Sequence, residues 1–316
     1  MKGSGMHGLA TVDQDVIRRV VEELCAPQSY QVVAHRGNHD IPMPSVQVLE
    51  EIVESLRSVL FPGYFGHSEL RVETMPYYVG STLDHVARQL AEQIRRGISF
   101  LADSDAMDAD KQLPLDRAQE ITARFLQTLP KIRHLLSTDV RAAFDGDPAA
   151  HSHGETIFCY PSISALTNFR IAHELYLCKV PLIPRIITEM AHSATGIDIH
   201  PGAQIGEYFF MDHGTGIVIG ETTIIGNHVR IYQGVTLGAK SFPLDEHGNP
   251  IKGMARHPIV EDDVIIYSGA TVLGRIVIGR GSEIGGNVWL THSIGPGSRI
   301  VQGSPEETAF SSGEGI

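Results

Sequence analysis

The stretch Val260–Leu290 reads VEDDVIIYSGATVLGRIVIGRGSEIGGNVWL and carries an aliphatic residue at every sixth position. These residues are Val260, Ile266, Val272, Ile278, Ile284 and Leu290. An α-helix has a period of 3.6 residues and a strand a period of two, so neither keeps a six-residue repeat on one face. The repeat is typical of a parallel β-helix, in which each short strand turns one aliphatic side chain inward.

The same period extends to both sides of this stretch. A second register contains Val264, Ala270, Ile276, Ser282, Val288, Ile294 and Ile300, and upstream registers contain Ile199, Ile205, Met211, Ile219, Ile225, Ile231 and Leu237. Glycines often follow the large aliphatic residues and suit the corners of such a fold. We therefore predict a β-helix over residues 196–305, interrupted by a loop at 239–255. That loop is rich in Pro and Gly, and a long loop between regular stretches is more often functional than not.

Residues 1–195 have a helical pattern instead. In Ser45–Leu60 apolar residues recur every three or four positions, which places them on one helix face. Ser81-Thr-Leu-Asp84 has the form of a capping box and predicts a helix that runs towards Phe100. Further helices are expected at 118–136, 163–176 and 181–190, the last with Pro181 in its first turn. The predicted fold is thus α+β in sequence order: a helical domain, 1–195, a β-helix, 196–305, and a flexible tail, 306–316.

Composition excludes several classes of protein. The 316 residues are 42% hydrophobic and 20% charged, as in ordinary globular proteins, and the formal charge of −12 argues against a nucleic-acid partner. We find no apolar stretch of the length that a signal peptide or membrane span needs. The three cysteines, Cys25, Cys159 and Cys178, show no CxxC spacing. We expect a cytoplasmic protein.

Several motifs together resemble the serine acetyltransferase family. They are Gly196-Ile-Asp-Ile-His-Pro201, Met211-Asp-His-Gly-Thr-Gly216, Ile219-Gly-Glu-Thr222, Val235-Thr-Leu-Gly238 and Arg256-His-Pro258, preceded by Asp147-Pro-Ala149 and Phe169-Arg-Ile-Ala-His173. The resemblance covers about 137–305 and implies a left-handed β-helix that assembles as a homotrimer or as a hexamer of two trimers. It also implies transfer of the acetyl group of acetyl-CoA to the hydroxyl of L-serine, a step of cysteine synthesis.

This reaction needs a base, because a serine hydroxyl is a poor nucleophile until a group near pH 7 takes its proton. His213 is the candidate, in a corner flanked by glycine. Asp198 lies fifteen residues earlier, slightly less than one turn of three hexapeptides, so the two side chains could meet on adjacent coils and the carboxylate could fix the imidazole tautomer. The catalytic pair of the family matches these two positions. The alternative for Asp198 is a turn-forming residue.

Recognition of serine requires groups for its carboxylate and its ammonium. Arg256, beside His257, offers a bidentate guanidinium and could reach into a site lined by a neighbouring subunit. Asp147 and Asp212 match the residues that hold the ammonium in the family, and Glu221 matches another active-site position without an assigned role. The alternatives are a solvated Arg256 at a loop end and an Asp147 that only starts a turn before proline.

Acetyl-CoA is expected in a groove between β-helices. Gly238, Ala239, Ser268 and Gly269 match positions whose main chain contacts this co-substrate in the family. The chain departs from the commoner pattern twice: Gly238-Ala-Lys240 precedes a longer insert, and Glu283 stands where a basic residue is frequent. The CoA phosphates are therefore expected at Lys240, Lys252 or Arg280. No metal is expected.

The resemblance also implies two partners. Family members that bind O-acetylserine sulfhydrylase insert a C-terminal isoleucine carboxylate into its active site, and Gly313-Glu-Gly-Ile316 resembles that peptide. Cysteine is expected as a feedback inhibitor that occupies the serine site.

Three other functions remain open from the residues alone. A zinc hydratase of the γ-carbonic anhydrase type needs three converging histidines, and the β-helix contains His200, His213, His228, His257 and His292 without the close pair expected for it. An acetyltransferase for a sugar or amine would leave Arg256 without an α-carboxylate to bind. An inactive scaffold would leave the spacing of Asp198 and His213 unexplained.

Overall fold

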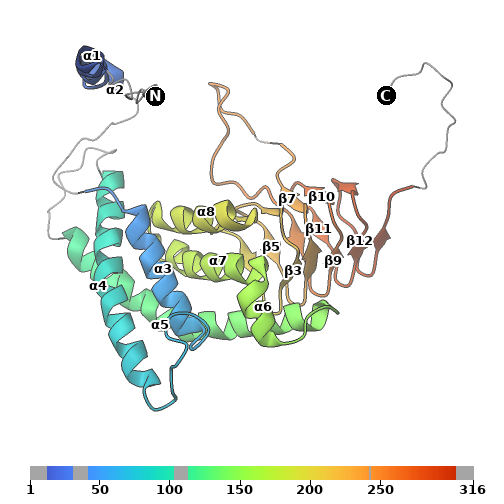
Figure 1. Cartoon of the computed structure of the whole chain (residues 1–316). Coiled ribbons are helices and arrows are strands. Elements are labelled where there is room, and N and C mark those ends of the chain that lie inside the picture. Colours follow the sequence, from blue (N-terminus) through green and yellow to red (C-terminus); the bar gives the residue numbers. More distant parts are fainter. Residues whose placement is uncertain (1–12, 31–41, 103–112, 242, 304–316) are drawn as a thin grey trace, which may run out of the picture.

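The computed structural model describes residues 13–30, 42–102, 113–241 and 243–303. Two parts follow one another along the chain, first helices up to Thr195 and then short parallel strands from Asp198 (Figure 1). The helices are α1 Gln14–Leu24, α2 Pro27–Tyr30, α3 Val46–Leu60, α4 Met75–Ala102, α5 Leu113–Gly146, α6 His153–Cys159, α7 Pro161–Leu177 and α8 Ile183–Thr195.

The helices confirm most of the predicted segments and correct two of their starts. Ser45 caps α3, because its Oγ accepts a hydrogen bond from the Val48 amide (3.3 Å). The capping box at Ser81 is wrong: α4 begins at Met75, with Pro76 in the first turn where a missing N–H costs nothing. Ser81 lies inside that helix, and its hydroxyl donates to the Tyr78 carbonyl.

The last helix, α8, begins at Ile183 and not at Pro181. Leu182, which precedes it, has a φ of 61° and cannot be helical, and Pro184 occupies the first turn in place of Pro181. The predicted segment at 118–136 is part of the longer helix α5, which continues past Pro130.

In the part of the chain that the structure describes, fourteen short strands form three parallel sheets that make the faces of a prism. The strands are β1 Asp198–Ile199, β2 Gln204–Ile205, β3 Phe210–Asp212, β4 Val218–Ile219, β5 Ile224–Ile225, β6 Arg230–Tyr232, β7 Thr236–Gly238, β8 Ile259–Val260, β9 Ile265–Ile266, β10 Thr271–Leu273, β11 Val277–Ile278, β12 Glu283–Ile284, β13 Trp289–Leu290 and β14 Arg299–Ile300. Their orders are β1-β4-β7-β10-β13, β11-β8-β5-β2 and β14-β12-β9-β6-β3. Neighbours in a sheet are three strands apart along the chain, as a β-helix requires, except for β12 and β14 at the end of the third sheet.

The hexapeptide repeat forms the core of this prism. Each residue of the first predicted register, from Val260 to Leu290, is at most 1% exposed, so the inward assignment is confirmed. Ser282 is the polar exception in the second register and is also fully buried. Its hydroxyl donates to the Gly295 carbonyl (3.1 Å) and accepts from the Ser298 amide (3.2 Å), which satisfies it.

The first coil is longer than the regular ones. Stacked partners are 18 residues apart at Val218 and Thr236, but 20 apart at Asp198 and Val218. The two extra residues lie between β3 and β4, because Met211 and Ile219 both point inward and are eight residues apart. The corner between these strands is therefore enlarged.

The other irregular coil contains the predicted loop, which leaves the prism between β7 and β8 (Figure 1). Among the described residues, no helix combines the length and the apolar character that a membrane crossing needs. Residues 304–316 lie outside the residues that the structure describes. The flexibility of the tail and the insertion of Ile316 into a sulfhydrylase therefore stay predictions.

Candidate active site

His213 occupies the enlarged corner between β3 and β4. Its φ of 56° is in the left-handed region, which is uncommon for a residue other than glycine and occurs often at functional sites. The side chain is 73% exposed, and its Nδ1 lies 4.0 Å from Asp212 Oδ1. The corner thus presents an imidazole to solvent beside a carboxylate.

Asp147 lies immediately after α5 and approaches the same corner. Its Oδ2 accepts a hydrogen bond from the Tyr160 hydroxyl (2.5 Å), and its Oδ1 accepts one from the Ala149 amide (2.8 Å). The Tyr160 bond, then the Ala149 amide and the nearby His213, lower the pKa of Asp147 below its ordinary value. Asp147 is therefore held as a carboxylate within electrostatic range of the imidazole.

Tyr160 was not predicted from the sequence. It precedes α7. Burial, followed by the hydrogen bond to Asp147 and the charge of that residue, raises the pKa of the Tyr160 hydroxyl, with a smaller contribution from Asp212. In the sequence, Tyr160 stands before Pro161, a pattern that indicates the start of a helix and does not indicate a functional residue. We call Asp147, Tyr160, Asp212 and His213 the His213 group.

Arg256 and Glu221 form the centre of a second set of residues. Arg256 Nη2 donates to Glu221 Oε2 at 2.8 Å, and the Tyr176 hydroxyl donates to Glu221 Oε1 at 3.4 Å. Burial would raise the pKa of Glu221, but the Arg256 hydrogen bond and positive neighbours lower it below its ordinary value. The two side chains of the ion pair are about a quarter exposed, so both are reached by solvent.

His257 is buried behind this ion pair. Its Nδ1 accepts a hydrogen bond from the Thr222 amide (3.0 Å), which leaves the ring proton on Nε2. Burial, followed by the charge of Arg256, lowers the pKa of His257 to about 4, so the ring is neutral at pH 7. A Cβ on Gly220 would lie 2.1 Å from the imidazole, so this position needs glycine.

Asp198 and His200 lie on the same side of the prism as Arg256. His200 Nδ1 accepts from the Gly202 amide (3.0 Å), and burial, followed by the charge of Arg185, lowers the pKa of His200 to about 4. The Asp198 carboxylate partly offsets this lowering of the His200 pKa, because its negative charge lies near the imidazole. We call Asp198, His200, Glu221, Arg256 and His257 the Arg256 group.

The two groups occupy different corners of the prism. The His213 group lies at the β3–β4 corner, whereas Glu221 and His200 lie at the stacked β4–β5 and β1–β2 corners. Within the described part of the chain, no hydrogen bond or ion pair links one group to the other, and Asp198 does not bond to His213. One chain therefore brings the predicted residues together as two separate sets.

The residues expected to contact acetyl-CoA through the main chain lie on two coils. Gly238 ends β7 beside Leu273 of β10. Gly269 has a φ of 69° and stacks on Gly234, where an added Cβ would lie 3.4 Å from the Gly269 Cα. The Ser268 carbonyl accepts from the Asn287 amide (2.9 Å).

The basic residues expected at the CoA phosphates are separated. Lys240, next to the half-buried Ala239, lines a pocket of about 230 Å³ with Arg256 and Arg275. Lys252 is exposed on the loop, whereas Arg280 pairs with Asp262 (2.6 Å). Glu283 lies near Arg299, with 3.5 Å between Oε2 and Nε.

In the described ranges, no three histidine, cysteine or carboxylate side chains gather as a metal centre would require. The choice between an acyltransferase and a hydratase therefore depends on the relatives of the chain.

The chain is 56% identical over 276 residues to "Serine acetyltransferase, plasmid" of Synechococcus elongatus, which covers 87% of this chain and 86% of the relative. This chain belongs to the serine acetyltransferase family. It is therefore an acyltransferase. None of the family models compared with the chain matches it.

Solved serine acetyltransferases have the same fold. Isoform 3 of Entamoeba histolytica, in complex with cysteine, superposes with a TM-score of 0.69 at 33% identity, over 94% of this chain and 96% of that one. The Neisseria gonorrhoeae serine acetyltransferase in complex with serine has a TM-score of 0.51 at 25% identity, over 83% and 97%. The predicted order, a helical part followed by a left-handed parallel β-helix, is confirmed.

Proposed function

We propose that this acyltransferase transfers the acetyl group of acetyl-CoA to the hydroxyl of L-serine, giving O-acetyl-L-serine and CoA. The observation that carries the proposal is the His213 group, in which an exposed imidazole lies beside two carboxylates at an enlarged corner. The Neisseria gonorrhoeae relative binds serine, and an amino-acid acceptor suits such a set of charges.

His213 is the general base of the proposed mechanism. It takes the proton of the serine hydroxyl while the oxygen attacks the thioester carbonyl, and it returns a proton to the CoA sulfur as the tetrahedral intermediate collapses. Asp198 is assigned to the second imidazole nitrogen, where a carboxylate stabilises the imidazolium.

The charged residues of both groups recognise the amino acid. Asp147 and Asp212 bind the ammonium, and the partly exposed Arg256 binds the carboxylate. His257 donates its Nε2 proton to a serine oxygen. The main chain of Gly238, Ala239, Ser268 and Gly269 contacts the pantetheine amides of acetyl-CoA, and Lys240 binds its phosphates at the pocket that Arg275 also lines.

We further propose that the site is completed between two protomers of a trimer, with the His213 group from one and the Arg256 group from the next. The separation of the two groups in one chain supports this arrangement. Mixing two inactive variants tests it. In a random mixture of H213A and R256A chains, about one quarter of the interfaces combine an intact His213 with an intact Arg256. About one quarter of the wild-type activity should return; a mixture as inactive as its components would refute the shared site.

Cysteine is proposed to compete for the serine position. The Entamoeba histolytica relative binds cysteine, which has the same ammonium and carboxylate as serine. Inhibition should therefore be competitive with serine, and R256K should weaken cysteine and serine binding together.

Release of free thiol from acetyl-CoA, with and without L-serine, tests the reaction itself. Serine-dependent release that H213A abolishes, together with O-acetyl-L-serine detected by mass spectrometry, is the expected result. H228A is the matched control, because His228 is exposed at another corner with a nearly equal φ of 57°. Release with a different acceptor and none with serine would overturn the substrate.

A further inference from the structure

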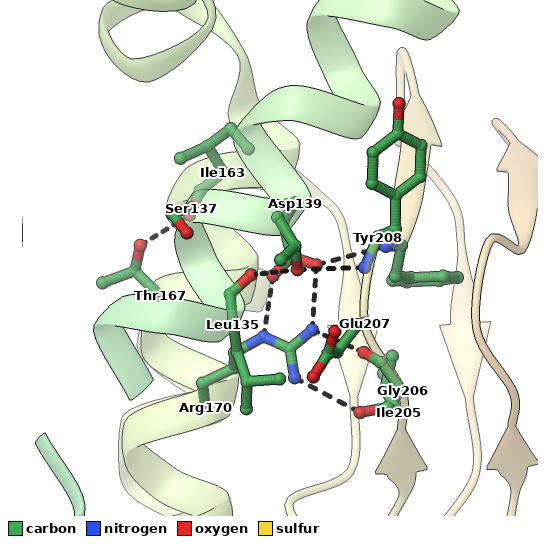
Figure 2. Close-up of polar contacts among 12 residues, drawn as sticks. Leu135, Ser137, Asp139, Ile163, Thr167, Arg170, Ile205, Gly206, Glu207 and Tyr208 are labelled. Carbon is green, nitrogen blue, oxygen red and sulfur yellow. Dashed lines mark hydrogen bonds and ion pairs between the residues drawn. The ribbon is translucent and has the colours of Figure 1, made fainter. Parts of the chain in front are cut away.

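A buried ion pair joins the two long helices that approach the β-helix. Arg170 of α7 donates through Nε and Nη2 to Asp139 of α5, at 2.7 and 2.9 Å (Figure 2). The side chains are 3% and 0% exposed, so water does not screen the pair. Such a pair needs all of its remaining polar atoms satisfied to be tolerated in a protein interior.

The remaining atoms of the pair bond to the first coil of the β-helix. Arg170 Nη1 donates to the Ile205 carbonyl (3.2 Å), and Nη2 also donates to the Gly206 carbonyl (2.9 Å) (Figure 2). Asp139 Oδ1 accepts from the Phe209 amide (3.2 Å). The neighbouring Thr138 hydroxyl accepts from the Tyr208 amide (3.0 Å).

These contacts satisfy backbone polar groups at the open end of the prism. The first coil donates its amides to the second coil, as Gly206 N donates to Ile225 O (3.0 Å). The first coil has no preceding coil to donate to its outer carbonyls, and a buried carbonyl without a partner is costly. The guanidinium of Arg170 takes the place of that coil for Ile205 and Gly206.

The same pair lies at the junction of all three elements that carry the His213 group. Asp139 lies eight residues before Asp147, near the end of α5, and Arg170 lies ten residues after Tyr160, on α7. The corner bonded by the pair leads directly into β3, which ends at Asp212 beside His213. A shift at this junction would therefore change the distance between the ammonium-binding carboxylates and the base.

We propose that Asp139 and Arg170 are positioning residues, which set the Asp147 carboxylate and the His213 imidazole at the separation that serine needs. This inference rests on the proposed function, since it concerns the serine site of that reaction. Displacements of about 1 Å at a reacting centre can cost about 100-fold in rate, so a small movement of the corner is enough. The residues for acetyl-CoA, Gly238 and Gly269, lie on later coils that the pair does not touch.

The chain offers a matched control in a second ion pair between the same helices. Lys131 of α5 donates to Glu174 of α7 at 2.7 Å, and neither side chain contacts the β-helix through a hydrogen bond among the described residues. E174Q weakens the packing of α5 against α7 without releasing the corner. Any effect of R170K that E174Q lacks is therefore due to the corner contacts.

The test compares kcat/KM for serine and KM for acetyl-CoA in wild type, R170K, E174Q and the double variant D139L/R170M. The double variant removes both charges at once, a replacement that buried pairs often tolerate without loss of stability. R170K and the double variant should lower kcat/KM for serine about 10- to 100-fold and leave KM for acetyl-CoA within about twofold, with R170K the milder. E174Q should resemble wild type.

The outcomes separate this inference from the function on which it rests. A wild-type enzyme without serine-dependent thiol release refutes the function. The positioning role is overturned if wild type is active and a folded R170K or double variant has an unchanged kcat/KM for serine. It is also overturned if such a variant raises KM for acetyl-CoA as much as it lowers kcat/KM for serine. If both variants are insoluble while E174Q folds, the pair acts in folding and the inference is also wrong.

Discussion

The Tyr160 hydroxyl donates a 2.5 Å hydrogen bond to Asp147 Oδ2, and this bond connects the residue that precedes α7 with the residue that follows α5. It holds one carboxylate of the His213 group in a fixed orientation and lowers its pKa. Tyr160 therefore belongs to the candidate site although it has no charge at neutral pH.

Replacement of Tyr160 by Phe should raise KM for serine about tenfold, because a hydrogen bond to a charged group contributes roughly 1.5–3 kcal/mol. KM for acetyl-CoA should not change. Y208F is the control, since the Tyr208 hydroxyl bonds to Asp145, which lies at the end of α5 two residues before Asp147. Equal kinetics in Y160F and Y208F would exclude a role for Tyr160 in serine binding.

The variant E221Q should weaken serine binding through Arg256. The Glu221 carboxylate orients the guanidinium at 2.8 Å, and the neutral amide keeps the shape but loses the charge. We expect KM for serine to rise about 3- to 10-fold, as for a partly exposed charged pair. E246Q makes the same change on the exposed loop and should leave KM unaltered; a similar rise there would point to net charge instead.

The buried His257 should make the fold less stable in mild acid. Its folded pKa of about 4 lies below the value of about 6.5 in an unfolded chain. Between these values the unfolded chain binds a proton that the folded chain excludes, so stability falls as pH falls through this window. The loss at pH 5 is on the order of 1–2 kcal/mol.

Urea unfolding of wild type and H257N at pH 7.5 and pH 5 measures this loss. Asparagine keeps an acceptor for the Thr222 amide but does not titrate. The urea midpoint of H257N should therefore shift less between the two pH values than that of wild type. H151N, at an exposed histidine, should shift as wild type does. The same shift in all three proteins would contradict a buried neutral His257.

The variant G214A should inactivate the enzyme by distorting the corner of His213. Gly214 has a φ of 86°, and an added Cβ would lie 2.5 Å from Ile197 Cδ1. Gly248 has a similar φ of 81° but nothing within 4 Å, so G248A introduces the backbone strain of about 1–2 kcal/mol alone. We expect kcat to fall more than tenfold in G214A and less than twofold in G248A. A comparable kcat in both would show that the corner tolerates the change.

The fold was predictable because its core is periodic along the chain. Each inward position of a coil must be filled by a small or aliphatic residue, and the six-residue step therefore stands in the sequence itself. Even the enlarged corner has a signal there, since Met211 and Ile219 are eight residues apart where the repeat expects six. The start of α4 was missed because a local capping pattern at Ser81 fits both a helix start and a helix interior.

The sequence by itself determined the period, the inward residues, the interrupting loop and the motifs around His213 and Arg256. The tertiary structure decided which side chains meet: it joined Tyr160 to Asp147 and Arg170 to Asp139, and it separated the His213 group from the Arg256 group. The physical reason is that inward aliphatic positions obey a local repeat, whereas a polar contact depends on two segments that pack together from distant parts of the chain. No spacing along one segment encodes such a contact.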